Sequence, residues 1–147
     1  MRHSIRTLLL SSALASALSV SLLAGAPASA ATTLERALVT KINASRAVYG
    51  LRALPVRSGL TWRAHNHSLA MARQHRLYHS DLSKVCCYRS VGENVGYGST
   101  LYRVHRALMN STSHRANIMA TRWDSIGVGV VQSGGNLWVT EIFRDTA

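Results

Sequence analysis

The sequence has few cysteines, few acidic residues and, beyond its first thirty positions, no long apolar run. Its 147 residues include two cysteines, two prolines and one phenylalanine, and six Asp and Glu residues stand against seventeen Lys and Arg residues. Two adjacent cysteines cannot supply the four ligands of a CxxC-type zinc knot, so that class of structural site is excluded. The lack of a second apolar run leaves no further segment of membrane-spanning length.

The one long apolar run lies near the N-terminus. Arg2 and Arg6 precede an apolar stretch over residues 8–23, and Ala28–Ser29–Ala30 offers the small residues typical of a signal peptidase site. This pattern predicts a secretory signal peptide over residues 1–30 and a single domain over residues 31–147. The alternative is an uncleaved anchor, for which the run is short. We therefore expect a secreted protein, extracellular or associated with the cell wall, with no transmembrane segment after cleavage.

The charge is strongly positive. The formal net charge is +11, and removal of residues 1–30 would leave +9. Such a charge favours anionic partners. The basic residues are scattered and no nucleic-acid-binding motif is present, so nucleic acid is not expected. For an exported chain we expect an anionic envelope polymer, a lipid or a protein ligand; the alternative is that the charge serves only solubility.

Hydrophobic periodicity predicts helices first and a β-hairpin last. The predicted elements are helices over about residues 32–50, 58–76, 99–108 and 111–119, and strands over residues 125–131 and 137–143. Thr32 and Glu35 have the spacing of a capping box, and the turn over residues 133–136 contains two glycines. Residues 77–98 are predicted to be rich in loops. This order predicts an α+β domain.

The two cysteines, Cys86 and Cys87, are adjacent. A disulfide between them would join neighbouring residues, which is far from ordinary bridge geometry. The sequence leaves three alternatives open: this vicinal disulfide, two free thiols, or bridges to another chain. A vicinal disulfide before Glu93 also raises the hypothesis of a redox switch.

Three residues are candidates for chemistry: His79, Glu93 and His114. They lie in separate segments, and their separations of 14 and 21 residues fit no compact metal motif. Neutral imidazoles bind transition metals, and a nearby carboxylate can act as a ligand or as a base. Two histidines and a carboxylate therefore suit zinc or another divalent cation. The spacing is equally compatible with a structural role, in which hydrogen bonds hold each of these side chains in place.

Several segments together resemble the CAP superfamily, also called the SCP or PR-1-like domain, in its short bacterial form. These segments span nearly all of residues 34–143 in order. They are Leu69–Ala72 leading to His79–Ser80, Gly92–Val95, Asn110–Met119, Ile126–Val130 and Trp138–Phe143. The GEN residues of the second segment and the SHRANIM residues of the third are the most specific.

The resemblance implies a three-layer α-β-α sandwich with a small, largely antiparallel sheet. It also implies a cleft in which His79 and His114 are the two histidines and Glu93 is the glutamate. Some members of the superfamily bind a divalent metal through these histidines. Ser111 stands where the fuller tetrad has a second glutamate, which removes one negative charge and one possible base.

Two further residues are cleft candidates by the same comparison. Glu141 stands where related segments often have glutamine, and it would either supply a carboxylate to the cleft or form a salt bridge. Arg115 follows His114 and would bond loop carbonyls or Glu93. The alternative is a structural role for both.

The function expected from these features is a binding or interaction module rather than an enzyme. The alternative is a metal-assisted hydrolase or protease, in which His79 and His114 hold the metal and Glu93 is the general base. No GxSxG or other nucleophile signature is present. A thiol protease that uses Cys86 or Cys87 has little support.

Overall fold

A computed structural model describes residues 32–146 of the chain. The expected signal peptide lies outside these residues. In chain order the elements are α1 (Thr33–Val48), α2 (Ser58–Gln74), the short 3-10 helix η1 (Leu82–Lys84), β1 (Ser90–Gly98), α3 (Leu101–Asn110), α4 (Thr112–Met119), β2 (Ser125–Ser133) and β3 (Asn136–Asp145). None of the helices in this part of the chain has the length and hydropathy needed to span a bilayer.

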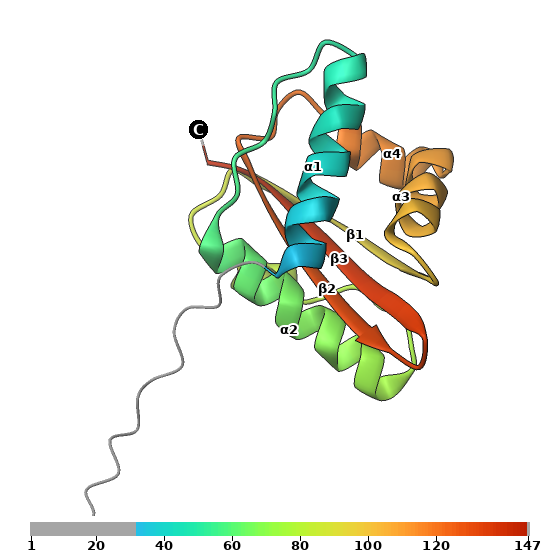
Figure 1. The fold of residues 1–147 in the computed structure, drawn as a ribbon. Coiled ribbons are helices and arrows are strands. Elements are labelled where there is room, and N and C mark those ends of the chain that lie inside the picture. Colours follow the sequence, from blue (N-terminus) through green and yellow to red (C-terminus); the bar gives the residue numbers. More distant parts are fainter. Residues whose placement is uncertain (1–31, 147) are drawn as a thin grey trace, which may run out of the picture.

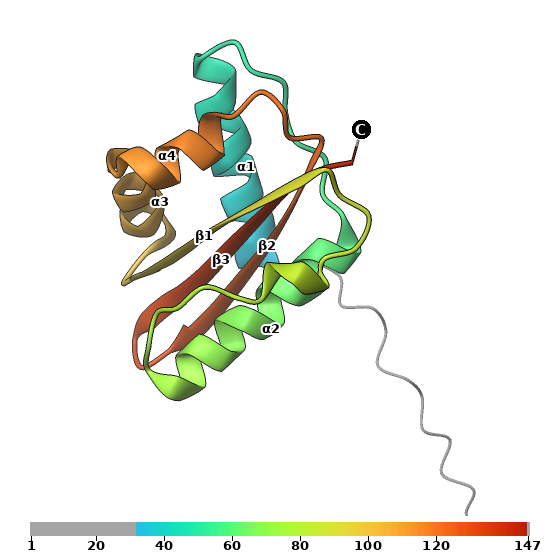
Figure 2. The ribbon, with the colours of Figure 1, turned by 180° about the vertical axis from the view of Figure 1, so that it is seen from behind.

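The strands form the middle layer of a three-layer sandwich. Their order is β1-β3-β2, and both neighbouring pairs are antiparallel. Helix α2 covers one face of the sheet, and α1, α3 and α4 lie on the other face (Figures 1 and 2). The α-β-α sandwich with a small antiparallel sheet is therefore confirmed.

Two glycines allow α2 to pack closely on the sheet. A Cβ atom on Gly127 would lie 2.2 Å from the carbonyl carbon of Leu60, and one on Gly129 would lie 2.2 Å from that of Ala64. Contacts this short with backbone atoms are sterically forbidden, so only glycine permits this approach.

The opposite face of the sheet carries the larger core. Leu38 and Ile42 of α1 are fully buried there together with Trp123 and Phe143, whose rings stack with centroids 5.9 Å apart. Helix α1 begins as predicted, because the Thr32 side chain accepts from the backbone of Glu35 and the Glu35 side chain accepts from the backbone of Thr32. Both glycines of the hairpin turn have positive φ.

The prediction of loop over all of residues 77–98 is wrong in its second half. Ser90–Gly98 forms strand β1, which pairs along its whole length with β3. This segment contains three glycines and one asparagine, so it lacks the alternation of β-branched and polar residues that reveals a strand. Its strand conformation comes from pairing with distant residues of the chain rather than from local preference.

Candidate functional site

Glu93 and His79 are in direct contact. Glu93 lies on the face of β1 that points toward α2, opposite Ile142 of β3. The chain that follows α2 returns past this strand and carries His79 and Ser80 to the Glu93 carboxylate (Figure 2). His79 Nδ1 lies 2.8 Å from Glu93 Oε1. The pairing joins residues from two segments that are fourteen positions apart.

Both oxygens of the Glu93 carboxylate are occupied. Besides the contact with His79, Oε1 accepts from the Ser80 backbone N–H at 2.9 Å, and Oε2 accepts from the Ser80 hydroxyl at 2.5 Å. The Glu93 side chain is 1% exposed, whereas that of His79 is 61% exposed. A carboxylate oxygen accepts from an imidazole N–H, so this contact assigns the hydrogen to His79 Nδ1, while Nε2 makes no hydrogen bond with a described residue. Glu93 therefore orients His79, as a carboxylate does behind a ligating histidine.

His114 approaches from the other side of β1, on helix α4. Its Nδ1 lies 2.9 Å from the hydroxyl of Ser111, which precedes the helix. Burial lowers the pKa of His114, and the nearby His79 lowers it further. The neutral imidazole is thus favoured near pH 7. Ser111 stands in the position of the absent second glutamate. It carries no charge, and its hydroxyl contacts His114.

Two asparagines connect the parts of the site. Asn94 Nδ2 donates to the His114 carbonyl at 3.1 Å, and Asn117 Nδ2 donates to Asn94 Oδ1 at 2.9 Å and to the Glu93 carbonyl at 3.2 Å. Asn94 is fully buried. Satisfied buried networks of this kind fix relative positions. Helix α4 is therefore held to β1 at Glu93 and Asn94.

Glu141 does not form the expected ion pair with any described residue. It is fully buried on the sheet face opposite Glu93, where Oε2 accepts from Asn94 Nδ2 at 2.9 Å and Oε1 has no hydrogen-bond partner. Burial raises the pKa of Glu141 to about 7, and the Asn94 hydrogen bond offsets part of this effect. Glu141 lies behind the asparagines, not in contact with either histidine.

A cavity lies beside His114. It has a volume of about 260 Å³ and is bounded by Leu77, strand β1 at Val95 and Tyr97, and helix α3 at Leu108. Its other walls are mostly apolar, so His114 and Ser111 are its main polar groups. Arg115 does not reach this cavity or Glu93; its guanidinium lies over the ring of Tyr49, 4.8 Å from the centroid.

The side chains present do not fit a resident catalytic zinc. Such a site uses three protein ligands and an open position. Within residues 32–146, no group of three or more His, Cys, Asp or Glu side chains is arranged to hold a metal ion. His79 and His114 can offer one imidazole nitrogen each, while the Glu93 oxygens are already engaged. The two histidines therefore supply one ligand fewer than the three that a catalytic zinc site uses.

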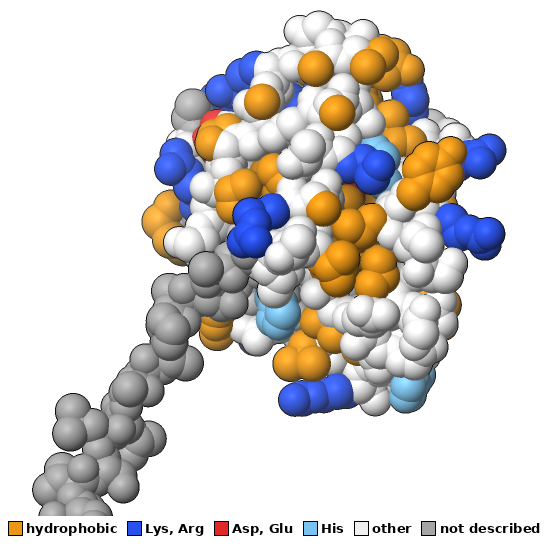
Figure 3. Space-filling model, viewed as in Figure 1, with side chains coloured by type: hydrophobic (Ala, Val, Ile, Leu, Met, Phe, Trp, Pro, Cys, Tyr) orange, Lys and Arg blue, Asp and Glu red, His pale blue; other side chains and the backbone are white. Residues whose placement is uncertain are grey.

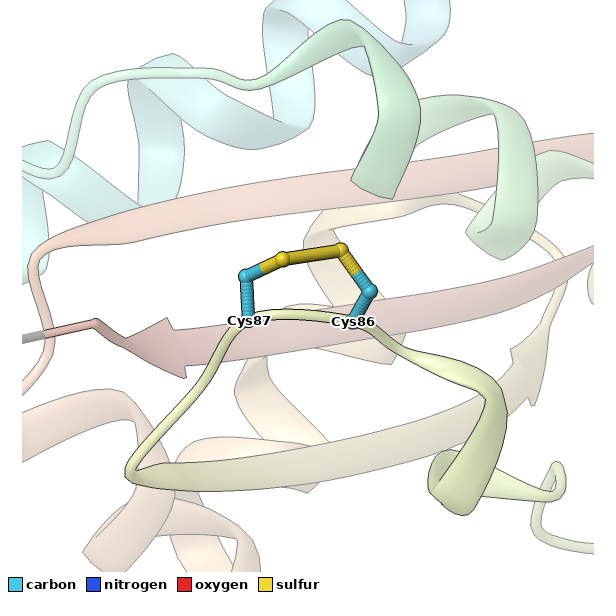
Figure 4. Close-up of a disulfide and its surroundings, with 2 residues drawn as sticks. All are labelled: Cys86 and Cys87. Carbon is cyan, nitrogen blue, oxygen red and sulfur yellow. A yellow bond between two sulfur atoms is a disulfide. The ribbon is translucent and has the colours of Figure 1, made fainter.

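Cys86 and Cys87 are joined to each other by a disulfide (Figure 4). The two side chains point to the same side of the loop between η1 and β1. Cys87 has a φ of 62°, a conformation unusual for a residue other than glycine. No other cysteine occurs in the sequence.

Sequence reasoning did not identify Ser80 as part of the site. It supplies two of the three hydrogen bonds to Glu93. The only signal was its position directly after His79. A serine is common in loops, so its contact with a carboxylate thirteen residues away needed the tertiary structure.

Comparison with known proteins agrees with this architecture. Residues 39–143 match the model of the CAP, or cysteine-rich secretory protein, family. The uncharacterized protein YkwD of Bacillus subtilis is 32% identical over 124 residues, which cover 77% of this chain and 48% of that protein. This chain thus spans about half the length of that relative.

Two solved structures illustrate the shared fold. An outer surface protein from Borrelia burgdorferi superimposes with a TM-score of 0.69 at 19% identity, covering 76% of this chain and 92% of that one. An extracellular SCP-domain protein from Bacillus anthracis gives a TM-score of 0.68 at 20% identity, covering 76% of this chain and 40% of that one. On the family match and the shared fold, this chain belongs to the CAP, or cysteine-rich secretory protein, family.

Proposed function

We propose that this protein is a secreted CAP-domain binding module that attaches to an anionic component of the cell envelope or its surroundings. The observation that carries this proposal is the unequal burial of its charges. Four of the six acidic residues are buried, whereas Arg46 is the only buried Lys or Arg among the described residues. Most of the charged groups exposed on the described surface are therefore basic.

The buried acids make their contacts inside the fold rather than with solvent. Glu35 contacts His65, Glu93 contacts His79 and Asp145 pairs with Arg89, while Glu141 is largely protonated below its pKa of about 7. Figure 3 shows the consequence on one face, where Lys and Arg side chains are spread over the surface and very little acidic surface is visible. A positive electrostatic potential over the surface attracts polyanions and speeds their association with the protein.

The geometry of Glu93 favours binding over hydrolysis. A general base must present a free lone pair to a water molecule or substrate. Both Glu93 oxygens accept hydrogen bonds from His79 and Ser80, and the carboxylate is almost completely buried. The Nε2 atoms of His79 and His114, which make no hydrogen bond with a described residue, are better suited to contacting a bound ligand. The names of the Borrelia and Bacillus anthracis proteins, an outer surface protein and an extracellular protein, support the proposed location.

The proposal is tested by sedimentation of the purified protein with isolated envelope fractions. We expect binding at low ionic strength that weakens progressively as NaCl rises, because exposed charges are screened. Absence of binding to every fraction at all salt concentrations would refute the proposal.

A parallel assay addresses catalysis. Wild-type protein and the Glu93→Ala variant are incubated with peptide and ester substrates, with and without added Zn²⁺. We expect no turnover by either protein. Zinc-dependent hydrolysis that is lost in Glu93→Ala would favour the hydrolase alternative.

A further inference from the structure

A second cavity lies at the N-terminal end of α2. Its volume is about 330 Å³, and its walls include three arginines, Arg57, Arg63 and Arg144, with no acidic residue. We call this cavity the arginine pocket. It does not include His79, Glu93 or His114, so it is separate from the candidate site.

The three arginines come from different parts of the fold. Arg57 immediately precedes α2, Arg63 lies within α2, and Arg144 lies near the end of β3. Arg144 shares the sheet face of Ile142, which packs against α2, so its side chain lies beneath the helix. Separate elements thus bring three arginines to one cavity.

None of these arginines forms a salt bridge with a described acidic residue. The Nε atom of Arg144 is buried and has no hydrogen-bond partner. Asp124 lies near Arg144 but directs its carboxylate to Ser125 and Thr146. The pocket therefore presents positive charge, and no carboxylate is among its lining residues. The first turn of α2, which has no side-chain cap and no acidic residue, adds to the positive potential.

The opposite wall of the pocket is the loop that contains Val85 and Cys86. Val85 is buried against Leu60 and Ile142, and the disulfide joins Cys86 to its neighbour Cys87 in the same loop (Figure 4). The Arg89 backbone N–H also donates to the Asp145 carbonyl at 2.7 Å. These contacts fix the wall against the sheet, so the cavity is preformed rather than built on binding.

We propose that the arginine pocket binds the phosphate group of a phosphodiester polymer. Guanidinium groups recognise phosphate through charge-assisted, often bidentate hydrogen bonds. A phosphodiester has two non-bridging oxygens at a tetrahedral phosphorus and two weaker ester acceptors, so its acceptors point in more directions than the two coplanar oxygens of a carboxylate. This inference rests on the proposed function and assigns its ligand class and its site.

A polymer fits better than a free phosphate ion because the cavity continues along α2. Arg63 and Val85 also line an adjacent cavity of about 300 Å³, which is bordered by Trp62 and Lys84. Trp62 is 58% exposed and offers a flat surface to the uncharged part of a repeating unit. Lys84 lies 3.6 Å from Asp81, so this second cavity is less positive than the first.

The test measures binding of the full-length secreted protein to poly(glycerol phosphate) by isothermal titration calorimetry in about 150 mM NaCl, where exposed charges more than about 8 Å apart are largely screened. The triple variant Arg57→Gln, Arg63→Gln and Arg144→Gln is compared with a control, Arg73→Gln, Arg103→Gln and Arg106→Gln, which removes the same charge from exposed positions elsewhere. We expect the pocket variant to lose at least about tenfold in affinity and the control less than about threefold. Equal losses in both variants, or no loss in the pocket variant, would overturn the proposal.

Two further ligands identify the chemistry. Polyglutamate of matched charge should bind wild-type protein at least about tenfold more weakly than the phosphodiester polymer, because carboxylates match the three donors less well. Inorganic phosphate should compete only at much higher concentration. Equal binding of polyglutamate would exclude a phosphate site, and equal affinity for inorganic phosphate would exclude the polymer.

The single variant Arg57→Gln, at an exposed position, provides a second measurement if the triple variant fails to fold. It should still weaken polymer binding by at least about threefold, and unchanged affinity would contradict the assignment. If the pocket variant sediments with envelope fractions as wild type does, the pocket is not the site but the envelope proposal stands. If wild type binds no fraction, the envelope proposal itself fails.

Discussion

Individual carboxylates in this protein act mainly inside the fold. Glu35 caps α1 and contacts His65, and Glu93 holds His79 and Ser80. A buried carboxylate is tolerated only when hydrogen bonds or opposite charge compensate its desolvation. The acidic residues therefore contribute to position and stability rather than to surface recognition.

The Glu93→Gln substitution tests the positioning role of this carboxylate. We expect it to destabilise the protein by about 1–3 kcal/mol, because three hydrogen bonds to a charged acceptor become weaker or lose their partner. Urea unfolding of wild type and variant measures the difference. Asp81→Asn is the matched control, since Asp81 is exposed, and it should change stability by less than about 0.5 kcal/mol. An unaffected Glu93→Gln protein would show that the carboxylate is not a structural anchor.

Glu141 should make stability depend on pH. Its folded-state pKa is raised by burial from 4.5 to about 7, so the folded protein binds a proton that the unfolded chain releases between these values. The contribution of Glu141 to stability is therefore fully present below about pH 4.5 and is lost as the pH rises through about 7. The full loss is on the order of 3 kcal/mol.

The Glu141→Gln substitution should remove this contribution. Glutamine keeps the shape and the bond from Asn94 but cannot ionise. We expect the variant to equal wild type near pH 5 and to be more stable than wild type near pH 8, as measured by thermal unfolding at both pH values. A variant that is less stable than wild type at pH 8 would contradict the role of the buried charge.

The elements are arranged so that the edge strand β1 carries the candidate site. Helix α4 is tied to this strand by Asn94 and Asn117, and the segment after α2 is tied to it by Glu93. The site therefore depends on how closely both helical layers approach the sheet. On the α2 side that distance is set by Gly127 and Gly129.

Replacement of Gly129 by alanine should disrupt this packing. The new Cβ atom would overlap the Ala64 backbone, which cannot move without shifting α2. We expect destabilisation of about 3 kcal/mol or more, measured by chemical denaturation. Gly59→Ala is the control because its Cβ would meet no atom within 4 Å, and it should be neutral or slightly stabilising. Equal behaviour of the two variants would mean that the close approach is not required.

The whole molecule carries an excess of exposed positive charge. All six acidic residues and fifteen of the seventeen Lys and Arg residues lie within residues 32–146, which gives this part a formal charge of +9. Since most of the acids are inside, repulsion among the surface bases is only weakly compensated. Net charge far from zero favours solubility and polyanion binding but destabilises the compact state.

Added salt should therefore stabilise the protein. We expect the Tm to rise by a few degrees between about 20 and about 200 mM NaCl as like-charge repulsion is screened. Differential scanning fluorimetry measures the change. The Arg73→Gln, Arg103→Gln and Arg106→Gln variant should gain less from salt than wild type. A Tm that falls with added NaCl would show that screened attractions outweigh repulsions.

The sequence alone determined the helices, the hairpin and the family. Capping residues, helical periodicity and turn glycines act over a few residues, so they can be read from local order, as the Thr32–Glu35 capping box illustrates. The resemblance of the GEN and SHRANIM segments then indicated the sandwich and named His79, Glu93 and His114. The helices and the hairpin depend on interactions between residues close in the sequence. The family resemblance depends on several segments that match the superfamily in the same order along the chain.

Tertiary structure decided what depends on distant contacts. Strand β1 exists because β3 pairs with it, and the arginine pocket exists because Arg144 lies under the start of α2. The burial of Glu141 and the saturation of Glu93 by Ser80 likewise depend on which layer each side chain faces. Burial and hydrogen-bond partners arise from packing between segments far apart in the chain, so no local pattern of residues records them.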